Sequence, residues 1–163
     1  MQLLGEYLVS IDNKGRLRVP TALLRQLGEP AAEVGGYEFV LNRGFEGALT
    51  LYPRVVWEGI SARVNRLNRF NERNRKLIRF FHSGATPLVT DNADRILLPK
   101  ALMDYAQLSD EAVLLAIRDY VEIWSPARYE QLLSENAEDI ADLANDVLGG
   151  GEEGVGEEDL LLS

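Results

Sequence analysis

The sequence predicts an α+β protein with a mainly β core, assembled from two tandem copies of one unit. The stretch SIDNKGRLRVP at residues 10–20 returns as VTDNADRILLP at residues 89–99, so one turn and its strand are repeated. Alternating segments with an aromatic residue close to a proline occur in both halves, as ALTLYP at 48–53 and YVEIWSP at 120–126. Each half then closes with a segment of helical periodicity.

The first copy predicts its elements in a clear order. The β-prone segment EYLVSI leads into the turn DNKG, a short strand RLRV and a brief helix PTALLRQL that proline opens. Gly28 suits the end of that helix, because glycine accepts backbone angles that other residues avoid. A hairpin of YEFVLN, the loop RGFEG and ALTLY follows, and its counterpart in the second copy is AVLLAI, RD and YVEIW.

A longer amphipathic helix is predicted over about 54–81, with an apolar side and a basic side. The apolar side consists of Ile60, Val64, Leu67, Phe70, Leu77, Ile78 and Phe81. The basic side consists of Arg66, Arg69, Arg73, Lys76 and Arg79. A solvated face is the simplest interpretation of these cations; a contact with an acidic helix of a neighbouring subunit and a surface for nucleic acid are the alternatives.

A second amphipathic helix is predicted at the end of the other copy, with Ser125 as its N-cap and Pro126 as its first residue. Its apolar stripe consists of Tyr129, Leu132, Leu133, Ile140, Leu143 and Val147. Its acidic outer face consists of Glu135, Glu138, Asp139, Asp142 and Asp146.

These elements divide the chain into five segments. We expect a first unit at 5–53, a basic connector helix at 54–82, a second unit at 83–126, an acidic helix at 127–148 and a disordered acidic tail at 149–163. Four short strands and a brief helix make a small core with exposed strand edges. The repeat therefore favours two interleaved units that lend strands to each other.

Charge and composition exclude several classes of function. The net charge is −9, yet residues 1–82 carry +5 and residues 83–163 carry −14, so the acidic total hides a basic half. The chain has no cysteine and one histidine, His82, which leaves no ordinary transition-metal site and no Ser-His-Asp relay. No phosphate-binding glycine motif is present, and we expect neither an enzyme nor a cofactor. The absence of a signal sequence or a long apolar run predicts a cytoplasmic protein without membrane insertion.

The repeated turn contains the residues with the clearest chemical meaning. Asp12 and Asp91 are predicted to organise their turns by accepting backbone hydrogen bonds, and Gly15 supplies an unusual backbone angle in the first. Arg16 and Arg95 can pair with these carboxylates and still offer donors to a phosphate or a guanine edge.

The cations beside the first turn add to this pattern. Lys14 and Arg18 have no evident structural task, so phosphate contact is favoured. Arg43 and Arg118 recur at matching hairpin ends, where anchoring through salt bridges is favoured over base reading.

Several long stretches together resemble the MraZ family of bacterial transcriptional regulators, which is related in fold to the AbrB-type swapped-hairpin DNA-binding proteins. They are GEYLVSIDNKGRLRVP, FVLNRGFEGALTLYP, FFHSGATPLVTDNADRILLP and VEIWSPARYEQ, and the likeness covers about residues 1–135.

This resemblance implies a swapped-hairpin β-barrel of two units related by a pseudo-two-fold axis and flanked by helices. It also implies a ring homo-oligomer, an octamer or a dodecamer, associated with the nucleoid. The ring would bind short direct repeats in double-stranded promoter DNA of the division and cell-wall gene cluster, as a repressor. The residues that match the family's DNA-binding turns are Asp12, Lys14, Arg16, Arg18, Asp91 and Arg95.

The two turns differ in their charge. Lys14, Gly15 and Arg18 of the first copy correspond to Ala93, Asp94 and Leu97 of the second, so the second turn loses two cations and gains an acid. We therefore expect the first turn to dominate DNA contact, with Arg16 and Arg18 on one face of their strand. Asp94 replaces the family's usual glycine and tolerates the left-handed backbone region better than most residues do.

Other interpretations stay open. Tyr52 and Trp124 end equivalent strands, where a place in the core is favoured over base stacking. The acidic tail at 149–163 could compete with DNA for the basic turns. A ring-forming structural or protein-interaction module without specific DNA binding is the alternative function.

Overall fold

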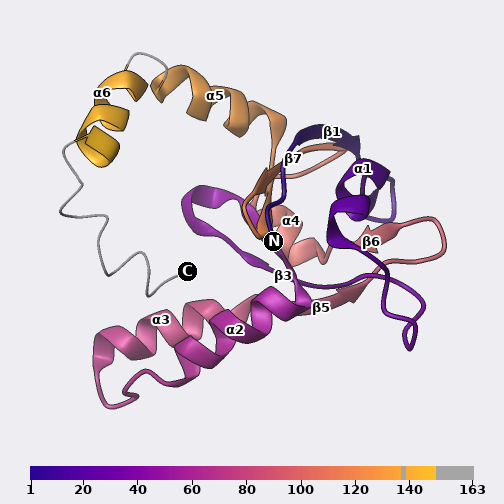
Figure 1. The fold of residues 1–163 in the computed structure, drawn as a ribbon, viewed down its shortest axis with the longest axis horizontal. Coiled ribbons are helices and arrows are strands. Elements are labelled where there is room, and N and C mark those ends of the chain that lie inside the picture. The colour runs from indigo at the N-terminus through magenta and orange to yellow at the C-terminus, as the bar shows by residue number, and fades with distance from the viewer. Residues whose placement is uncertain (137–138, 150–163) are drawn as a thin grey trace. The chain divides into compact units, whose positions relative to one another are not determined.

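The computed structural model describes residues 1–136 and 139–149 (Figure 1). The chain divides into two compact units, Met1–Pro126 and the segment that starts at Ala127. The first unit contains two repeats and the segment that joins them. The strands and helices of the first repeat are β1 (Glu6–Ser10), β2 (Arg16–Arg18), α1 (Thr21–Leu24), a 3-10 turn (Arg25–Leu27), β3 (Glu38–Arg43), a 3-10 turn (Phe45–Gly47) and β4 (Leu49–Pro53). Those of the second are β5 (Thr86–Val89), β6 (Arg95–Leu97), α4 (Lys100–Tyr105), β7 (Glu111–Ile117) and β8 (Tyr120–Trp124).

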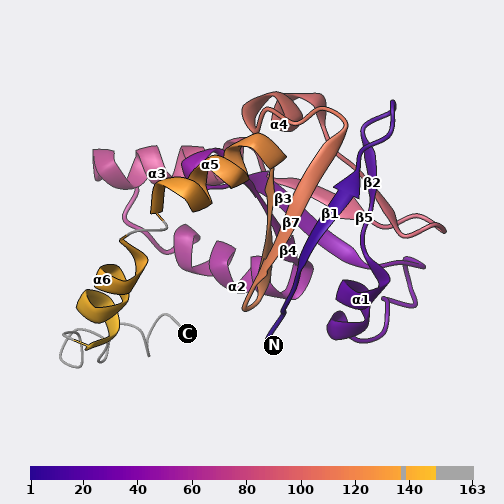
Figure 2. The ribbon, with the colours of Figure 1, turned by 90° about the horizontal axis from the view of Figure 1, so that it is seen from above.

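The two repeats are interleaved, as the sequence predicts. Six antiparallel strands form one sheet in the order β1-β7-β8-β4-β3-β5, and β2 pairs with β6 in a separate ribbon. The first strand of each repeat thus joins the hairpin of the other, β1 on β7 and β5 on β3; Figure 2 shows β1 running beside β7. The ribbon meets the edge of the sheet through a bridge between Ile11 and Leu17. This exchange of strands confirms the predicted α+β fold with its mainly β core.

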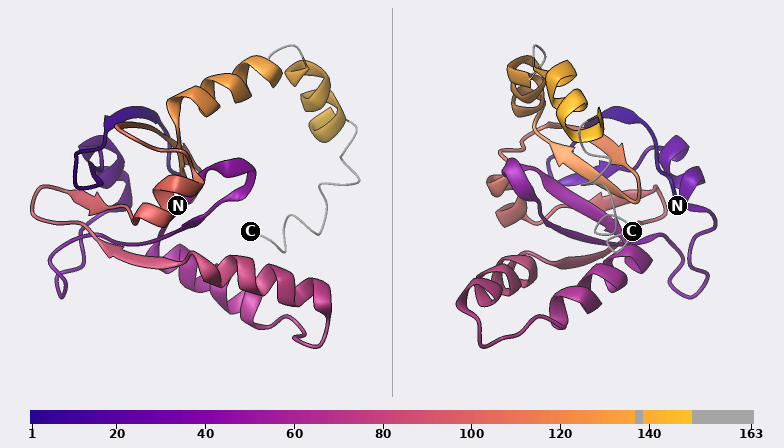
Figure 3. Two further views of the ribbon diagram at one scale, coloured as in Figure 1. Left: turned by 180° about the vertical axis from the view of Figure 1, so that it is seen from behind. Right: turned by 60° about the vertical axis from the view of Figure 1, so that its left-hand side comes forward.

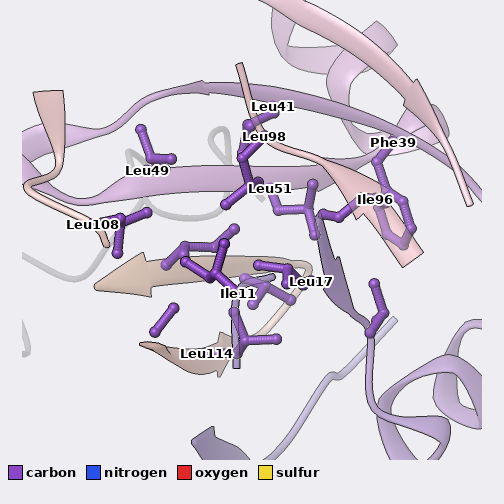
Figure 4. Packing of buried hydrophobic residues seen from close by; sticks show 14 of the residues in the cluster. Ile11, Leu17, Phe39, Leu41, Leu49, Leu51, Ile96, Leu98, Leu108 and Leu114 are labelled. Atoms are coloured by element: carbon purple, nitrogen blue, oxygen red, sulfur yellow. The ribbon is translucent and has the colours of Figure 1, made fainter. Parts of the chain in front are cut away.

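One hydrophobic core serves both repeats. Leu17 of β2 and Ile96 of β6 are opposite each other and almost completely buried, because alternate residues of a strand face opposite ways. Figure 4 shows them pointing toward Leu41, Leu51 and the other apolar side chains of the large sheet. Burial of these side chains from both copies explains why neither repeat needs a core of its own.

The helix predicted over 54–81 is wrong as a single element. The structure has two helices, α2 (Arg54–Asn65) and α3 (Glu72–Ser83), which lie side by side as a hairpin (Figure 3). The break follows from two asparagines. Asn68 Oδ1 accepts a hydrogen bond from the Phe70 N–H at 3.0 Å, and Asn71 caps α3 by accepting from the Asn74 N–H at 3.3 Å.

This turn also changes which residues are buried. Phe70, expected on the buried side, is 94% exposed at the tip of the hairpin, and Leu77 is 43% exposed. The hairpin is attached to the sheet near its other end, where the Trp57 and Phe81 rings stack with centroids 4.4 Å apart. Buried Asn42 of β3 donates to the Phe81 carbonyl at 2.6 Å, so a polar side chain in the sheet fixes the end of α3.

The second unit contains helices α5 (Pro126–Asn136) and α6 (Ile140–Ala144), and a π-helical turn (Asn145–Gly149) follows. The start at Pro126 agrees with the prediction, but the described residues form two helices where one was expected over 127–148. Residues 137–138, which separate them, lie outside the described residues, as does the predicted disordered tail except for Gly149. None of the described helices is long and apolar enough to cross a membrane.

Candidate nucleic-acid interface

The first repeated turn is held together by the carboxylate of Asp12. Its Oδ1 accepts hydrogen bonds from the backbone N–H groups of Lys14 and Arg16, both at 2.9 Å, and its Oδ2 accepts from Arg16 Nε at 2.8 Å. The Gly15 N–H donates to the Asp12 carbonyl at 3.0 Å, and Gly15 has a φ of +83°. One side chain therefore shapes the loop and fixes the direction of the Arg16 side chain.

The second turn repeats this geometry. Asp91 Oδ1 accepts from the N–H groups of Ala93 and Arg95 at 2.9 Å each, and Oδ2 accepts from Arg95 Nε at 2.9 Å. Asp94 takes the place of Gly15 with a φ of +60°, so the turn keeps its shape with an acid at this position.

The two turns are connected to each other across the β2–β6 ribbon. The Val19 N–H donates to the Asp94 carbonyl, and the Leu98 N–H donates to the Gly15 carbonyl, both at 2.8 Å. The turn of each repeat thus accepts a hydrogen bond from the residue that follows the ribbon strand of the other repeat. The sequence motif that is repeated along the chain becomes a single paired structure.

The outer face of this ribbon is cationic. Arg16 is opposite Leu97, and Arg18 is opposite Arg95, while the residues between them point into the core. We call Lys14, Arg16, Arg18 and Arg95 the basic ribbon face. Among the described residues, the terminal amino groups of the three arginines have no hydrogen-bond partner.

Arg18 has a structural contact that the sequence did not reveal. Its Nε donates to the Ala93 carbonyl in the second turn at 2.9 Å, so it joins two segments 75 residues apart. The corresponding residue of the other repeat, Leu97, has no donor and is 55% exposed. Only a tertiary structure could show this contact, because it depends on the pairing of β2 with β6. Lys14, in contrast, is exposed and its side chain has no partner among the described residues.

The turn hydrogen bonds keep both aspartates ionised. The Arg16 backbone N–H, as the largest cause, lowers the pKa of Asp12 below its ordinary value of 3.8, and the Arg16 side chain adds to this. The Arg95 backbone N–H has the same leading effect on the pKa of Asp91. Each arginine pairs with its carboxylate through Nε, which leaves its terminal amino groups as charge-assisted donors for an anion.

A groove of about 690 Å³ runs beside the first turn. Its lining includes Leu88, Leu97, Met103 and Leu108, with Lys14 and Lys100 among the charged residues. It was not expected from the sequence. The sequence feature that could have indicated this groove is Leu97, an apolar residue of the second repeat at the position of the outward-facing Arg18 in the first.

The arginines at the hairpin ends have different surroundings. Arg43 Nη1 donates to Ser83 Oγ at 3.1 Å, and its guanidinium lies 5.7 Å from the centre of the Tyr105 ring. It is anchored as predicted, though by these contacts and not by a salt bridge within the described residues. Arg118 is exposed, and its side chain has no partner in the part of the chain that the structure describes. The expected salt bridge is therefore not formed there.

The other candidates have structural surroundings. Trp124 is 3% exposed, and Tyr52 packs against Trp57 and Tyr120 with ring centroids 5.7 and 6.0 Å apart. The described residues contain no cluster of three or more metal-ligating side chains. His82 Nε2 lies 3.2 Å from Asn65 Oδ1, where it links α3 to α2.

Two interleaved repeats with paired aspartate-arginine turns define the class: a duplicated, strand-exchanged α+β protein with a cationic ribbon. Comparison with known proteins gives the family. The model of the MraZ protein family matches residues 2–80 and again residues 81–149, so the chain belongs to the MraZ family.

Curated relatives match most of the chain. A protein of Christiangramia forsetii is 41% identical over 150 residues, which are 91% of this chain and 94% of the relative. A protein of Flavobacterium psychrophilum is 36% identical over 90% of this chain and 92% of its own. A third relative, from Roseiflexus castenholzii, is 39% identical over 80% of this chain and 86% of its own. All three are named transcriptional regulator MraZ, which is the name of a regulator and not of an enzyme.

Proposed function

We propose that this protein is a sequence-specific transcriptional regulator that binds double-stranded DNA through the basic ribbon face. The observation that supports it most directly is the set of arginines on the outer face of β2 and β6, fixed through Nε with their terminal amino groups open. A guanidinium fixed in this way meets phosphate or guanine in a defined geometry. The names of the relatives point to the same function.

The finer features of the proposal come from the family resemblance. The protein acts as a repressor at direct repeats in the promoter of the division and cell-wall gene cluster, it is associated with the nucleoid, and it assembles into a ring. One basic ribbon face reaches few phosphates, so a single contact is weak and salt-sensitive. Neighbouring subunits would present the same face at a fixed spacing, and repeated DNA would then bind with a higher effective concentration.

The two turns do not contribute equally to this proposal. The first has Lys14 beside Arg16, whereas the second has Ala93 and the carboxylate of Asp94 beside Arg95. Since an acid repels phosphate and a lysine attracts it, the first turn should dominate.

A fluorescence-anisotropy titration tests the function. The duplexes are the DNA upstream of the protein's own gene and a shuffled sequence, each at two salt concentrations. We expect tight, salt-dependent binding to the native duplex, which Arg16→Ala weakens by roughly tenfold or more, and Arg95→Ala weakens less. Arg25→Ala, which removes an exposed cation elsewhere, is the matched control and should bind as the wild type does.

Two results would contradict the proposal. Equal, weak binding to both duplexes would favour the alternative of a structural or protein-interaction module. A greater loss for Arg95→Ala than for Arg16→Ala would overturn the assignment of the main contact to the first turn.

A further inference from the structure

The α2–α3 hairpin, residues 54–83, is the most basic part of this acidic chain, and we call it the basic arm. It contains eight of the 17 Lys and Arg residues and only two Asp or Glu. Five of its cations are exposed, and their side chains have no hydrogen-bond or ion-pair partner among the described residues. They are Arg66, Arg69, Arg73, Lys76 and Arg79.

The basic arm also leaves an apolar strip exposed on α3. Leu77 and Phe80 lie three residues apart on one face, and Leu77 is 43% exposed. Phe45, 71% exposed, stacks on Phe80 with ring centroids 6.0 Å apart and extends the strip. Helical spacing places Arg73 and Lys76 beside Leu77 and Phe80, so cations border the apolar strip.

The second unit has the complementary surface. Ile140, Leu143 and Val147 are 57%, 54% and 55% exposed, and their spacing of three and four residues places them along one side of the segment. The exposed acids that accompany them are Asp139, Asp142 and Asp146. From residue 135 onward the chain has ten Asp or Glu and no Lys or Arg.

We infer that the basic arm of one copy binds the acidic segment at residues 139–149 of a second copy. An acidic amphipathic partner would cover the apolar strip and pair with its cations together, whereas DNA would neutralise the cations and leave Leu77, Phe80 and Phe45 in water. The two surfaces are different from each other, so the contact is heterologous and can repeat from copy to copy around a ring. The inference rests on the self-association in the proposed function and names the surfaces that produce it.

Charge reversal of full-length protein tests this contact. The arm-reversed variant carries Arg73→Glu and Lys76→Glu, and the helix-reversed variant carries Asp142→Lys and Asp146→Lys; all four side chains are exposed. Each variant alone should show a lower mass in light scattering, with association weakened at least about tenfold, because like charges then meet. A one-to-one mixture should regain the wild-type mass, because each variant then meets the opposite charge on the other. A contact within one chain would not be restored by mixing.

Matched controls reverse the same number of charges elsewhere. Arg25→Glu with Arg118→Glu, and Glu29→Lys with Glu33→Lys, change exposed residues outside both surfaces and should keep the wild-type mass. Circular dichroism checks that every variant is folded.

The failures of the inference can be told apart. If the wild type is oligomeric and both reversed variants keep its mass, this inference is wrong and the proposed function still stands. The same holds if the mixture of the two variants stays dissociated. A monomeric wild type would overturn the ring as well. Weaker DNA binding by the arm-reversed variant at unchanged mass would assign the basic arm to DNA instead.

Discussion

At the scale of single residues, the paired turns show how one carboxylate can both shape a turn and fix the direction of an arginine. Asp12 and Asp91 each accept two backbone hydrogen bonds and one guanidinium bond, so each shapes its turn and positions an arginine. Their importance for the turn was predictable from the Asp-x-x-x-Arg spacing. The contact of Arg18 with Ala93 was not, because it joins two repeats through the tertiary structure.

The backbone angle at the third position after the aspartate gives a paired prediction. Gly15 and Asp94 both have a positive φ, which a Cβ atom disfavours. Gly15→Ala should lower the free energy of unfolding by about 1 kcal/mol, since the new Cβ would also lie 3.3 Å from the Leu98 carbonyl oxygen. Asp94→Gly should raise it by up to about 1 kcal/mol. Urea denaturation measures both, and a stabilising Gly15→Ala would contradict the argument.

The depressed pKa values of the two aspartates predict an acid-sensitive contribution to stability. The folded pKa lies below the ordinary value of 3.8, so the unfolded chain binds more protons in acid. The contribution is therefore complete above roughly pH 4 and is lost as the pH falls through the folded pKa. Asp12→Asn and Asp91→Asn should each be less stable than the wild type at neutral pH and approach it in acid.

Glu122 provides a control of opposite sign. Burial raises its pKa above the ordinary 4.5, even though Trp124 Nε1 donates to it at 3.1 Å. The free energy of unfolding of the wild type should therefore fall as the pH rises through the range in which Glu122 ionises. Glu122→Gln should make that fall smaller. Denaturant unfolding at a series of pH values separates the effect of the aspartates from that of Glu122. If the free energy of unfolding changed with pH in the same way in the wild type and in the aspartate variants, the prediction for the aspartates would be wrong.

At the scale of elements, strands were easier to predict than helix boundaries. Alternation and the internal repeat place the strands within one residue or so, because one face of each strand must be buried. The helical periodicity of 54–81 continued through residues 66–71, and it concealed the turn made by Asn68 and Asn71. Asparagine followed by Glu72 is a normal helix start, so the signal was present in the sequence but weaker than the apolar pattern.

The cap of α3 can be tested directly. Asn71→Ala removes the side-chain acceptor for the Asn74 N–H and should destabilise the start of α3 by about 1 kcal/mol. Amide hydrogen exchange should become faster in the first turn of α3, while β3 and β4 stay protected, because the hairpin has no fully buried residue of its own. Asn71→Asp, which can still cap, is the control. Uniformly faster exchange in the sheet would show that the cap stabilises the whole core.

At the scale of the whole molecule, duplication explains both the fold and the asymmetry of the site. Strand exchange between repeats was predictable, since a single repeat leaves strand edges open and lacks an adequate core. The separate pairing of β2 with β6, which joins the two turns into one face, depends on the final arrangement of the strands and could not be read from the repeat. Divergence of the copies then left the first turn cationic and placed an apolar groove next to it.

The number of DNA repeats should decide how tightly the assembled protein binds. A single ribbon face carries four cations, so one contact neutralises few phosphates, and its affinity should fall steeply with added salt. When several faces in one assembly bind one duplex, the second and third contacts become intramolecular, and affinity should rise by roughly 100-fold or more between one repeat and three. Moving the repeats apart by half a helical turn should remove most of this gain, because the faces keep their spacing while the sites rotate away.

Anisotropy titrations measure this effect with three duplexes, which carry one repeat, three repeats and three displaced repeats. The arm-reversed variant should bind the one-repeat and three-repeat duplexes with similar affinity. Equal affinity of the wild type for these two duplexes would rule out cooperation between subunits.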